Sequence, residues 1–181
     1  MTTNNKQQND ASGIRLKEIL GVLKKHHITS GIQPEKLRQI LEDLGPTYVK
    51  LGQIMSMRSD MLPESYCKEL ERLRTDVKPL PFDVIQSEIE KELGKPADEF
   101  FKEISPEPLG SASIAQVHPA VLSNGDQVVI KVQRPQIHEI MEEDIKLMRR
   151  AVSLLKFTMG TGELIDFRTV IDELWKTSQE E

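Results

Sequence analysis

The chain has 181 residues, of which 38% are hydrophobic and 4% aromatic, and its formal net charge is −5. This length suffices for one domain with its own core or for part of a larger protein, and the acidic balance argues against a nucleic-acid binder that relies on bulk positive charge. The single cysteine, Cys67, excludes an intramolecular disulfide framework and a zinc site built from several cysteines.

Metal binding and membrane insertion are also disfavoured by the sequence. None of the four histidines stands in a metal-ligand spacing, so we expect no metal site from them. No stretch approaches the ~20 apolar residues of a membrane-spanning helix, and the N-terminus lacks the pattern of a secretory signal. We therefore expect a cytoplasmic protein, and a peripheral position at a membrane stays open.

The N-terminal part of the chain predicts helices. Residues 1–12 are polar and small, which predicts a disordered tail. Residues 14–27 form an amphipathic pattern, and this helix serves either as a packing element or, alternatively, as a contact to a membrane surface or partner. Pro34 suits the first turn of the next helix, and a further helix is expected over 47–58.

The helix over 47–58 carries an unusual set of residues. Lys50 and Gln53 are three residues apart and share one face. Gly52 lies between them in the helix interior, where glycine costs about 1 kcal/mol relative to alanine. Close approach of a backbone or ligand would explain this glycine, and so would tight packing against a neighbouring helix.

Two more helices precede the β-rich part of the chain. They are expected over 64–74 and 82–93, with Gly94 as the C-cap of the second. The sequence VKPLP at 77–81 predicts a stiff extended linker between them. A short strand is expected over 103–108.

The stretch 109–135 predicts a β-hairpin, because Asn124-Gly125 stands between two β-rich runs and both residues tolerate a positive φ. Downstream of the turn, an apolar strand carries one cation, Lys131. Pro119 cannot donate to a strand ladder, which predicts an edge position or a bulge. Upstream lies a loop of four small residues, Gly110, Ser111, Ala112 and Ser113.

This layout has a chemical meaning. A loop of small residues lets backbone N–H groups approach an anion closely, and a lysine on a rigid strand stabilises charge without reorganising. Kinase N-terminal lobes grip nucleotide phosphates in this way. The alternatives are an ordinary turn for the loop and, for Lys131, a stem that packs on an edge strand while its ammonium reaches water.

Two long helical patterns complete the chain, over 136–157 and from about residue 166 onward. The second pattern carries three glutamates that are candidates for pairing with Lys50 or Lys131. Solvated charges on a helix face are the alternative for each of them. These candidate partners are Glu173, Glu180 and Glu181.

Three segments carry a family resemblance. Residues 44–53 read LGPTYVKLGQ, residues 108–118 read PLGSASIAQVH and residues 129–135 read VIKVQRP. In that order they resemble the signature N-terminal helix with its KxGQ motif, the alanine-rich loop and the third strand of the UbiB (aarF/ADCK) family of atypical protein kinase-like proteins. Motifs of this length in the right order are far more specific than a lone glycine fingerprint.

The resemblance implies a mostly helical α+β chain, with a protein kinase-like N-lobe built on a small antiparallel sheet and with family-specific N-terminal helices. We expect a disordered tail over 1–12, a helical extension over 13–103 that carries the KxGQ motif, and a truncated kinase-like N-lobe over 104–181. The sequence contains no HRD-like or DFG-like segment. The C-lobe is therefore expected to be absent, and the chain alone to be catalytically inactive.

For an intact family member the resemblance implies an atypical kinase or ATPase that binds ATP with Mg²⁺ and is linked to ubiquinone or isoprenoid-lipid metabolism. Lys131 would contact the α- and β-phosphates, and residues 110–113 would take the place of the glycine-rich loop. Lys50, Gly52 and Gln53 would project into the cleft where a kinase holds its protein substrate. Glu181 stands where the family's acidic αC motif would begin.

The alternative is a non-catalytic binding or regulatory fragment. Its N-terminal helices would act on a membrane surface, an isoprenoid lipid or a partner protein, and the nucleotide site would play no part. The amphipathic pattern over 14–27 is the residue feature that keeps this alternative open.

Overall fold

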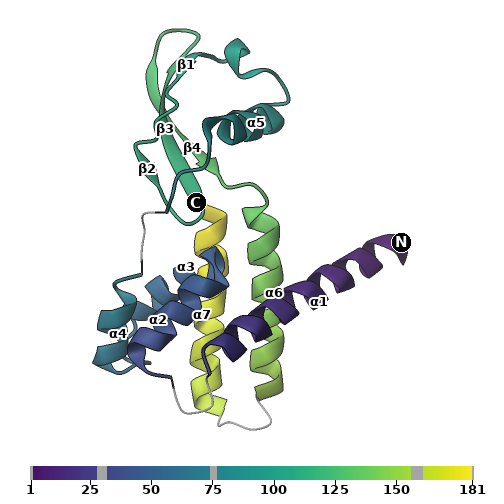
Figure 1. Ribbon diagram of the computed structural model, residues 1–181, viewed down its shortest axis with the longest axis vertical. Coiled ribbons are helices and arrows are strands. Elements are labelled where there is room, and N and C mark those ends of the chain that lie inside the picture. Colours follow the sequence, from purple (N-terminus) through teal and green to yellow (C-terminus); the bar gives the residue numbers. More distant parts are fainter. Residues whose placement is uncertain (1, 28–31, 74–76, 156–160, 181) are drawn as a thin grey trace. The chain divides into compact units, whose positions relative to one another are not determined.

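The computed structural model describes residues 2–27, 32–73, 77–155 and 161–180. Its contacts divide the chain into two units, which Figure 1 displays as ribbons. We call Met1–Leu73 with His138–Glu181 the helical unit, and Arg74–Ile137 the sheet unit. This division differs from the expected boundary between residues 103 and 104, because α5 packs on the strands that follow it and α7 packs on the N-terminal helices.

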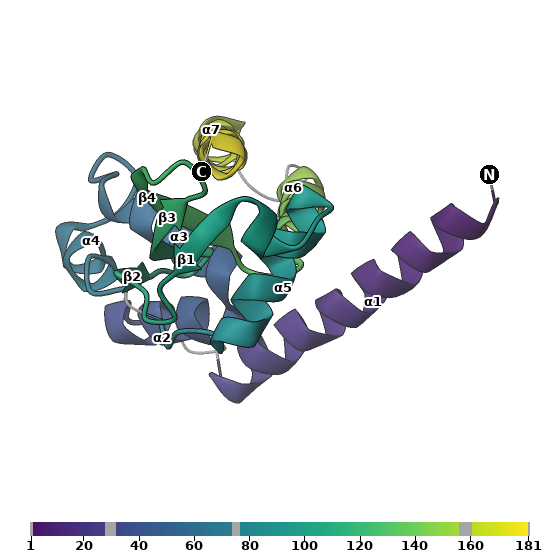
Figure 2. The same cartoon turned by 90° about the horizontal axis from the view of Figure 1, so that it is seen from above.

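The helical unit is built from long helices packed on one another. Helices α2, α3 and α4 contact each other, and α3 also contacts α7. Helices α6 and α7 run side by side (Figures 1 and 2), and the rings of His138 and Trp175 contact each other in a tilted arrangement, with centroids 5.8 Å apart. The elements are α1 (Thr2–Lys25), α2 (Pro34–Leu44), α3 (Pro46–Ser56), α4 (Glu64–Leu70), α6 (Ile137–Leu155) and α7 (Thr161–Glu180).

The start of α1 differs from the expected disordered tail. The helix begins at Thr2 and continues without a break to Lys25. Once a helix is nucleated, each added residue gains one backbone hydrogen bond without a new nucleation cost. The Ser12 hydroxyl also donates a hydrogen bond to the Glu143 carboxylate on α6, and this contact anchors the part of α1 that the sequence pattern left without an apolar anchor.

The joint between α2 and α3 follows from local sequence chemistry. Pro34 occupies the first turn of α2 as expected, and Gly45 ends that helix and precedes α3 with φ 102°. A residue with a side chain is strained at this φ, so glycine is required at the joint. The joint orients α2 so that Ile40, Leu41 and Leu44 are buried.

The sheet unit consists of one helix and a small antiparallel sheet. Helix α5 ends at Gly94, whose φ of 67° gives the expected left-handed cap. Strand β3 is central and pairs with β4 along one side and with β1 and then β2 along the other. The elements are α5 (Phe82–Leu93), the short 3₁₀ helix η2 (Ala97–Glu99), β1 (Phe101–Ile104), β2 (Gly110–Ser111), β3 (Ala115–Leu122) and β4 (Gln127–Gln133). The fold class expected from the sequence is thus confirmed.

The sheet has one covered face and one open face. On the covered face, Val132 is buried in a cluster with Ile85 and Ile89 of α5. The open face carries the opposite set of side chains, because neighbours along a strand point to opposite sides. Lys131 and Val129 belong to the open face and pair across the ladder with Val117 and Pro119.

The predicted hairpin between β3 and β4 is confirmed, but its connecting turn is not a two-residue loop. Only Gly125 has a positive φ, of 98°. The Gly125 amide donates to the Leu122 carbonyl and the Leu122 amide to the Asp126 carbonyl, which makes a three-residue loop ending in a left-handed glycine. The Asn124 side chain contributes through hydrogen bonds to Asp126 instead.

The expectation that Pro119 lies at an edge or a bulge is wrong. Pro119 is in the central strand, and the irregularity in pairing lies at Phe101/Glu103 of β1. The proline is tolerated because β1 pairs with β3 from Ala120 onward and β2 pairs only up to Val117. Its nitrogen therefore faces the gap between the two neighbouring strands, where no ladder acceptor is left unsatisfied.

Candidate functional site

Lys131 lies on β4 and on the open face of the sheet. It is exposed, and its neighbours on that face are Val117 across the ladder and Val129 two residues earlier. Within residues 77–137, no carboxylate is within ion-pair distance of its ammonium. The lysine predicted from the sequence is thus a strand-mounted cation whose charge is not neutralised inside the sheet unit.

The four small residues lie at the β2–β3 connection. Gly110 and Ser111 form β2 and pair with Val117 and Gln116, and the Ala112 amide donates to the Ala115 carbonyl at 2.8 Å. A Cβ atom added at Gly110 would meet no atom within 4 Å, so the space above this residue is open. Ser113, in contrast, is buried and only 7% exposed, which removes it from the solvent-facing side of the loop.

Arg134 directly follows β4 and contacts the small-residue loop, a role that sequence reasoning missed. Its Nη2 atom donates to the Ser111 hydroxyl oxygen at 2.9 Å and to the Lys78 carbonyl at 3.1 Å, and its Nε donates to the Ala112 carbonyl at 3.0 Å. Its backbone amide donates to the Ile114 carbonyl. The only signal in the sequence was an arginine between the strand and Pro135.

A buried polar chain holds the 77–81 segment to the sheet. The Leu80 amide donates to the Gln116 side-chain oxygen at 2.5 Å, and the Gln116 nitrogen lies 3.3 Å from Nε2 of His118. His118 Nδ1 lies 2.8 Å from the Ser105 carbonyl, so the proton must be on Nδ1. Gln116 and His118 are fully buried, and this chain satisfies their polar groups. Two polar residues at inward-facing strand positions could have indicated it.

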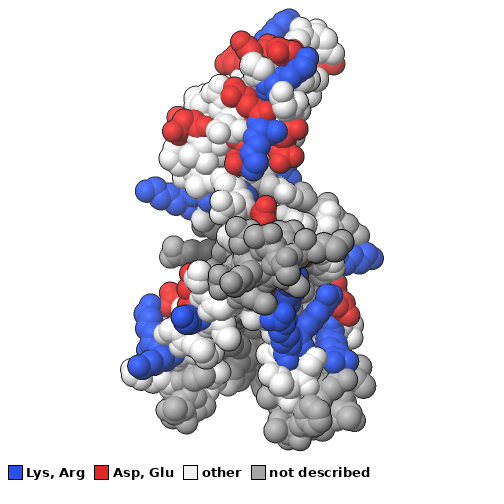
Figure 3. Space-filling view, turned by 90° about the vertical axis from the view of Figure 1, so that its right-hand side faces the viewer, with Lys and Arg blue, Asp and Glu red and all other residues white. Residues whose placement is uncertain are grey.

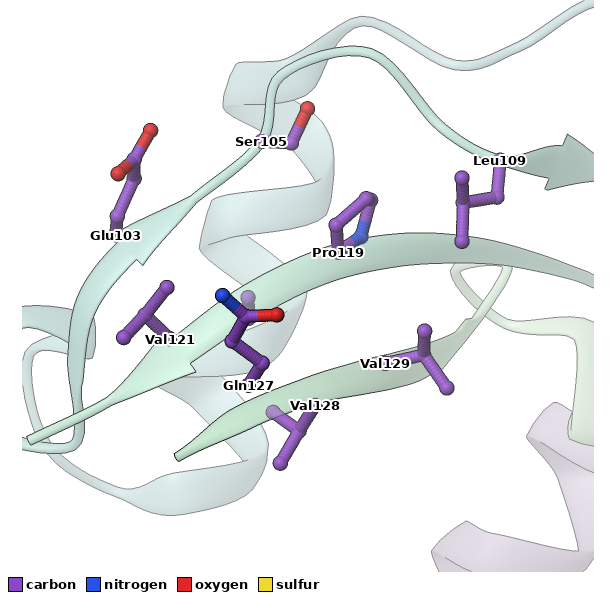
Figure 4. A pocket seen from close by; sticks show the side chains of 9 residues that line it. Glu103, Ser105, Leu109, Pro119, Val121, Gln127, Val128 and Val129 are labelled. Atoms are coloured by element: carbon purple, nitrogen blue, oxygen red, sulfur yellow. The ribbon is translucent and has the colours of Figure 1, made fainter. Parts of the chain in front are cut away.

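A shallow hollow of about 640 Å³ lies on the sheet, and its lining includes Val129, two residues before Lys131, and the polar side chains of Glu103 and Gln127. Figure 4 shows Pro119 of β3 next to Val129 of β4, with Leu109 beyond the proline. Val129 is 63% exposed and Leu109 is 68% exposed, which is unusual for large apolar side chains in a sheet. The open face thus combines an apolar surface with one cation at its edge.

The KxGQ residues lie on α3 of the helical unit. Lys50 and Gln53 are half-buried, and Gly52 is fully buried. A Cβ atom at Gly52 would overlap the side chain of Leu73 and lie 2.7 Å from Cδ1 of Leu41. Gly52 therefore serves tight helix packing, which is one of the two explanations that the sequence left open.

The three glutamates predicted as partners of Lys50 or Lys131 lie on α7 or at the end of the chain. Glu173 is exposed on α7, a helix that contacts α3 and whose residues Val170, Ile171 and Leu174 are buried. Glu180 is the last residue of α7, and Glu181 lies outside the described residues. The pairing of Lys50 or Lys131 with any of the three stays a prediction.

Sequence reasoning also missed a buried ion pair in the helical unit. Arg15 of α1 bonds both carboxylate oxygens of Asp144 on α6, at 2.7 and 3.0 Å, and donates to the Leu44 carbonyl at the end of α2. The Asp144 side chain is fully buried. The hydrogen bond to Asp144 raises the pKa of Arg15, and burial raises the pKa of the nearby Tyr48 hydroxyl. These residues connect three helices and show no route to a ligand.

The surface of the sheet unit carries both signs of charge. On the face drawn in Figure 3, acidic and basic side chains are interspersed, and pairs such as Lys91–Glu88 and Lys95–Glu99 neutralise each other locally. In the parts of the chain that the structure describes, no three His, Cys, Asp or Glu side chains lie close enough to hold a metal ion. None of the described helices is long and apolar enough to cross a membrane.

Comparisons with known proteins converge on one kind of domain. Residues 72–181, more than half of the chain, match the ABC1 atypical kinase-like domain. A probable protein kinase UbiB of Marinobacter nauticus is 42% identical over 147 residues, and these residues cover 81% of this chain and 27% of the relative. An uncharacterized protein in the hydrogenase 1 5′ region of Clostridium pasteurianum is 43% identical over 82% of this chain and 28% of its own length.

Among solved structures, the complex of Rv3197 with erythromycin from Mycobacterium tuberculosis is 32% identical, with a TM-score of 0.48, and covers 76% of this chain and 35% of its own. The chain thus spans little more than a quarter of the two curated relatives named above.

Proposed function

The chain belongs to the ABC1 atypical kinase-like family, and from this premise we propose that its sheet unit is the nucleotide-binding part of an atypical kinase or ATPase of the UbiB kind. Lys131 would hold the α- and β-phosphates of ATP, and the loop from Gly110 to Ser113 would lie against them. The supporting observation is Lys131 itself, a strand-mounted cation without a carboxylate partner in the described sheet unit.

The open face also suits the rest of a nucleotide. The apolar hollow formed by Leu109, Pro119 and Val129 would accept the flat, apolar faces of the base. The open space above Gly110 would let a phosphate approach the backbone. Exposed apolar side chains that could contact the base and a cation that could contact the phosphates thus occur on one sheet face.

In the whole protein we propose that ATP binds with Mg²⁺, and that the reaction is linked to ubiquinone or other isoprenoid-lipid metabolism, as the UbiB names of the relatives suggest. Phosphoryl transfer needs a positioning aspartate and metal-holding Asp or Asn groups. Segments that resemble these are not in the 181 residues. We therefore expect this chain alone to bind nucleotide weakly and not to turn it over.

We further propose a regulatory role for the KxGQ residues. Lys50 and Gln53 would project into the cleft where a kinase holds its protein substrate, while Gly52 would keep α3 packed closely against its neighbours in the helical unit. Because a buried lysine requires an anionic partner, Lys50 would pair with an acidic residue near the end of the chain. The candidates are Glu173, Glu180 and Glu181.

Calorimetric titration of the 181-residue chain with MgATP tests the nucleotide site. We expect measurable binding that Lys131→Met weakens by about 10-fold or more, because a charge-assisted contact to phosphate is lost. Lys95→Met is the matched control, since Lys95 is exposed in the same unit and paired only with Glu99. Equal affinities of the Lys131 and Lys95 variants would contradict the proposal.

Turnover is measured on the same proteins. We expect no steady-state ATP hydrolysis by the chain above the level of its Lys131→Met variant. Hydrolysis above that level would show that the chain carries a complete catalytic site, and the assignment of the missing groups to another part of the protein would then be wrong.

A second candidate function, contact with a membrane surface, has one observation in its favour. Ile14 and Leu20 of α1 are 60% and 55% exposed, and lysines lie on the same helix. Co-sedimentation of the intact chain with vesicles of anionic lipid tests it against Ile14→Gln/Leu20→Gln, two changes at exposed positions. Equal pelleting of the two proteins would remove the case for α1.

A further inference from the structure

Arg134 has an unusual hydrogen-bonding environment for an arginine. Its guanidinium donates to one hydroxyl oxygen and two backbone carbonyls, from Ser111, Ala112 and Lys78, and each of these acceptors is neutral. Within the described residues, no carboxylate approaches it within ion-pair distance. The burial of the group is not compensated by an anion, and it lowers the pKa of Arg134.

The three acceptors belong to two segments, and Arg134 itself belongs to a third. Lys78 lies in the extended segment before α5, Ser111 and Ala112 lie in and after β2, and Arg134 directly follows the strand that carries Lys131. The Val77 amide adds a direct bond to the Ser111 carbonyl at 2.9 Å. One side chain therefore fixes the small-residue loop relative to both the linker segment and the lysine strand.

The direction of these bonds determines what the loop can donate. Because Arg134 donates to Ser111 Oγ, the hydroxyl proton of Ser111 must point to another acceptor. Because Nε of Arg134 donates to the Ala112 carbonyl, the negative end of that peptide dipole faces a cation. Both effects make the loop a better partner for an anion than the same loop would be without Arg134.

We propose that Arg134 is a positioning residue for phosphate recognition: it locks the loop over residues 110–113 to the Lys131 strand and orients the Ser111 hydroxyl to donate to a phosphate oxygen. This inference rests on the proposed nucleotide site. Arg134 acts through Ser111 and the loop backbone. Its planar guanidinium donates from two separate nitrogen atoms, Nε and Nη2, whereas all three donors of a lysine lie on one nitrogen.

Hydrogen exchange of the 181-residue chain, without any ligand, tests the lock. In Arg134→Ala we expect exchange of the Val77 and Ala112 amides to accelerate by about 10-fold or more, the equivalent of one lost hydrogen bond from a charged donor. Arg134→Lys keeps the charge and is expected to behave like the alanine variant. The Leu122 amide, bonded to Asp126 in the hairpin turn, should stay unchanged and shows that the sheet is folded.

Titration with MgATP then tests the link to phosphate. Ser111→Ala removes the hydroxyl that would donate to phosphate, and we expect it to weaken binding by about 10-fold. It also removes one acceptor of Arg134 but keeps the bonds to Ala112 and Lys78, so we expect it to accelerate the exchange of the Ala112 amide less than Arg134→Ala does. The Arg134 variants should weaken binding as well. Combining Arg134→Ala with Ser111→Ala should add little to the larger single effect, since both changes remove one oriented donor.

Three results would overturn the inference. Unchanged exchange at Val77 and Ala112 in Arg134→Ala would show that other contacts hold the loop. Arg134→Lys equal to wild type in exchange and binding would show that only its charge matters. Wild-type affinity in Ser111→Ala would remove the hydroxyl from the site.

A wild-type chain that binds no MgATP would refute the proposed function and with it the phosphate-recognition role of Arg134. The exchange experiment would still decide whether Arg134 locks the loop, so the two failures are distinguishable.

Discussion

The partly buried arginines of the two units have opposite surroundings. In the helical unit, Arg15 pairs with the fully buried Asp144, and Arg38 pairs with Glu69, whose side chain is 10% exposed. Hydrogen bonds to these carboxylates raise the pKa of both arginines. In the sheet unit, Arg134 has neutral acceptors only, and its pKa is lowered by burial.

This difference separates structural charge from charge that is available to a ligand. A buried cation with its own carboxylate has its field neutralised, so it contributes to holding helices together and offers little to an external anion. Lys131 and Arg134 lack carboxylates within the described sheet unit, and Arg134 contacts a loop that has open space above Gly110. Their uncompensated positive charge is what an incoming phosphate would neutralise.

We expect the largest loss in the free energy of unfolding when a buried arginine loses the carboxylate that neutralises its charge. Asp144→Asn removes the buried anion of Arg15 and leaves it only the more exposed Glu18, and we expect a loss of about 3 kcal/mol in the free energy of unfolding. Urea unfolding followed by the fluorescence of Trp175 on α7, the single tryptophan, measures it in the helical unit.

Asp172→Asn is the control for this measurement, because the Arg149–Asp172 pair is 49% and 66% exposed and should contribute less than about 1 kcal/mol. Similar losses in the two variants would show that the Arg15–Asp144 pair is not a special contact.

A smaller effect is expected from the pH dependence of the helical unit. The hydrogen bond from Arg38 lowers the pKa of Glu69 below its ordinary value. Its stabilising contribution is therefore complete above the ordinary carboxyl pKa of about 4.3 and is lost as the pH falls through the lowered pKa of the folded state. Unfolding by urea at a series of pH values between about 6 and 3 should show wild type losing more stability than Glu69→Gln.

Glu64→Gln serves as the comparison at each pH, since Glu64 and Lys68 form a pair that is 78% and 70% exposed. If Glu69→Gln and wild type show parallel pH profiles, Glu69 is not a group whose ionisation is coupled to folding.

We expect the smallest change in stability from replacing Lys131, which has no carboxylate partner in the described sheet unit. Lys131→Met should change the stability of the sheet unit by less than about 0.5 kcal/mol, because an exposed lysine without a carboxylate has no ion pair to lose. Hydrogen exchange of the Leu122 amide in the absence of nucleotide measures it. A loss above about 1 kcal/mol would indicate a structural partner for Lys131 and would weaken the comparison between the units.

Local sequence signals predicted much of the fold. The expected helix over 82–93 has the bounds of α5, and Pro34 and Gly94 take their expected places at helix ends. These features depend on backbone preferences of single residues and on periodicity over a few turns. The helix that begins at Thr2 differs from the expected disordered tail, and the hydrogen bond from Ser12 to Glu143 of α6 joins residues 131 positions apart, which no local pattern reveals.

The candidate site was predicted only in part. Lys131 and the small-residue loop could be found because a strand pattern and a run of small residues are visible locally. Arg134 could not be assigned to the loop, since its acceptor in Lys78 is 56 residues away. The same holds for the pairing of Arg15 with Asp144, 129 residues apart. The position of Pro119 depended on which strands flank β3, which no local pattern reveals.

The sequence by itself determined the class of fold, the hairpin, the strand lysine and the family, because propensities, turn residues and motif order are properties of short segments. Only the tertiary structure decided which cations are neutralised and which are not, because that depends on carboxylates and carbonyls brought together from distant segments. The buried Arg15–Asp144 pair and the uncompensated Arg134 consist of the same kind of side chain. Their different surroundings give one a structural role and the other its proposed role at the phosphate loop.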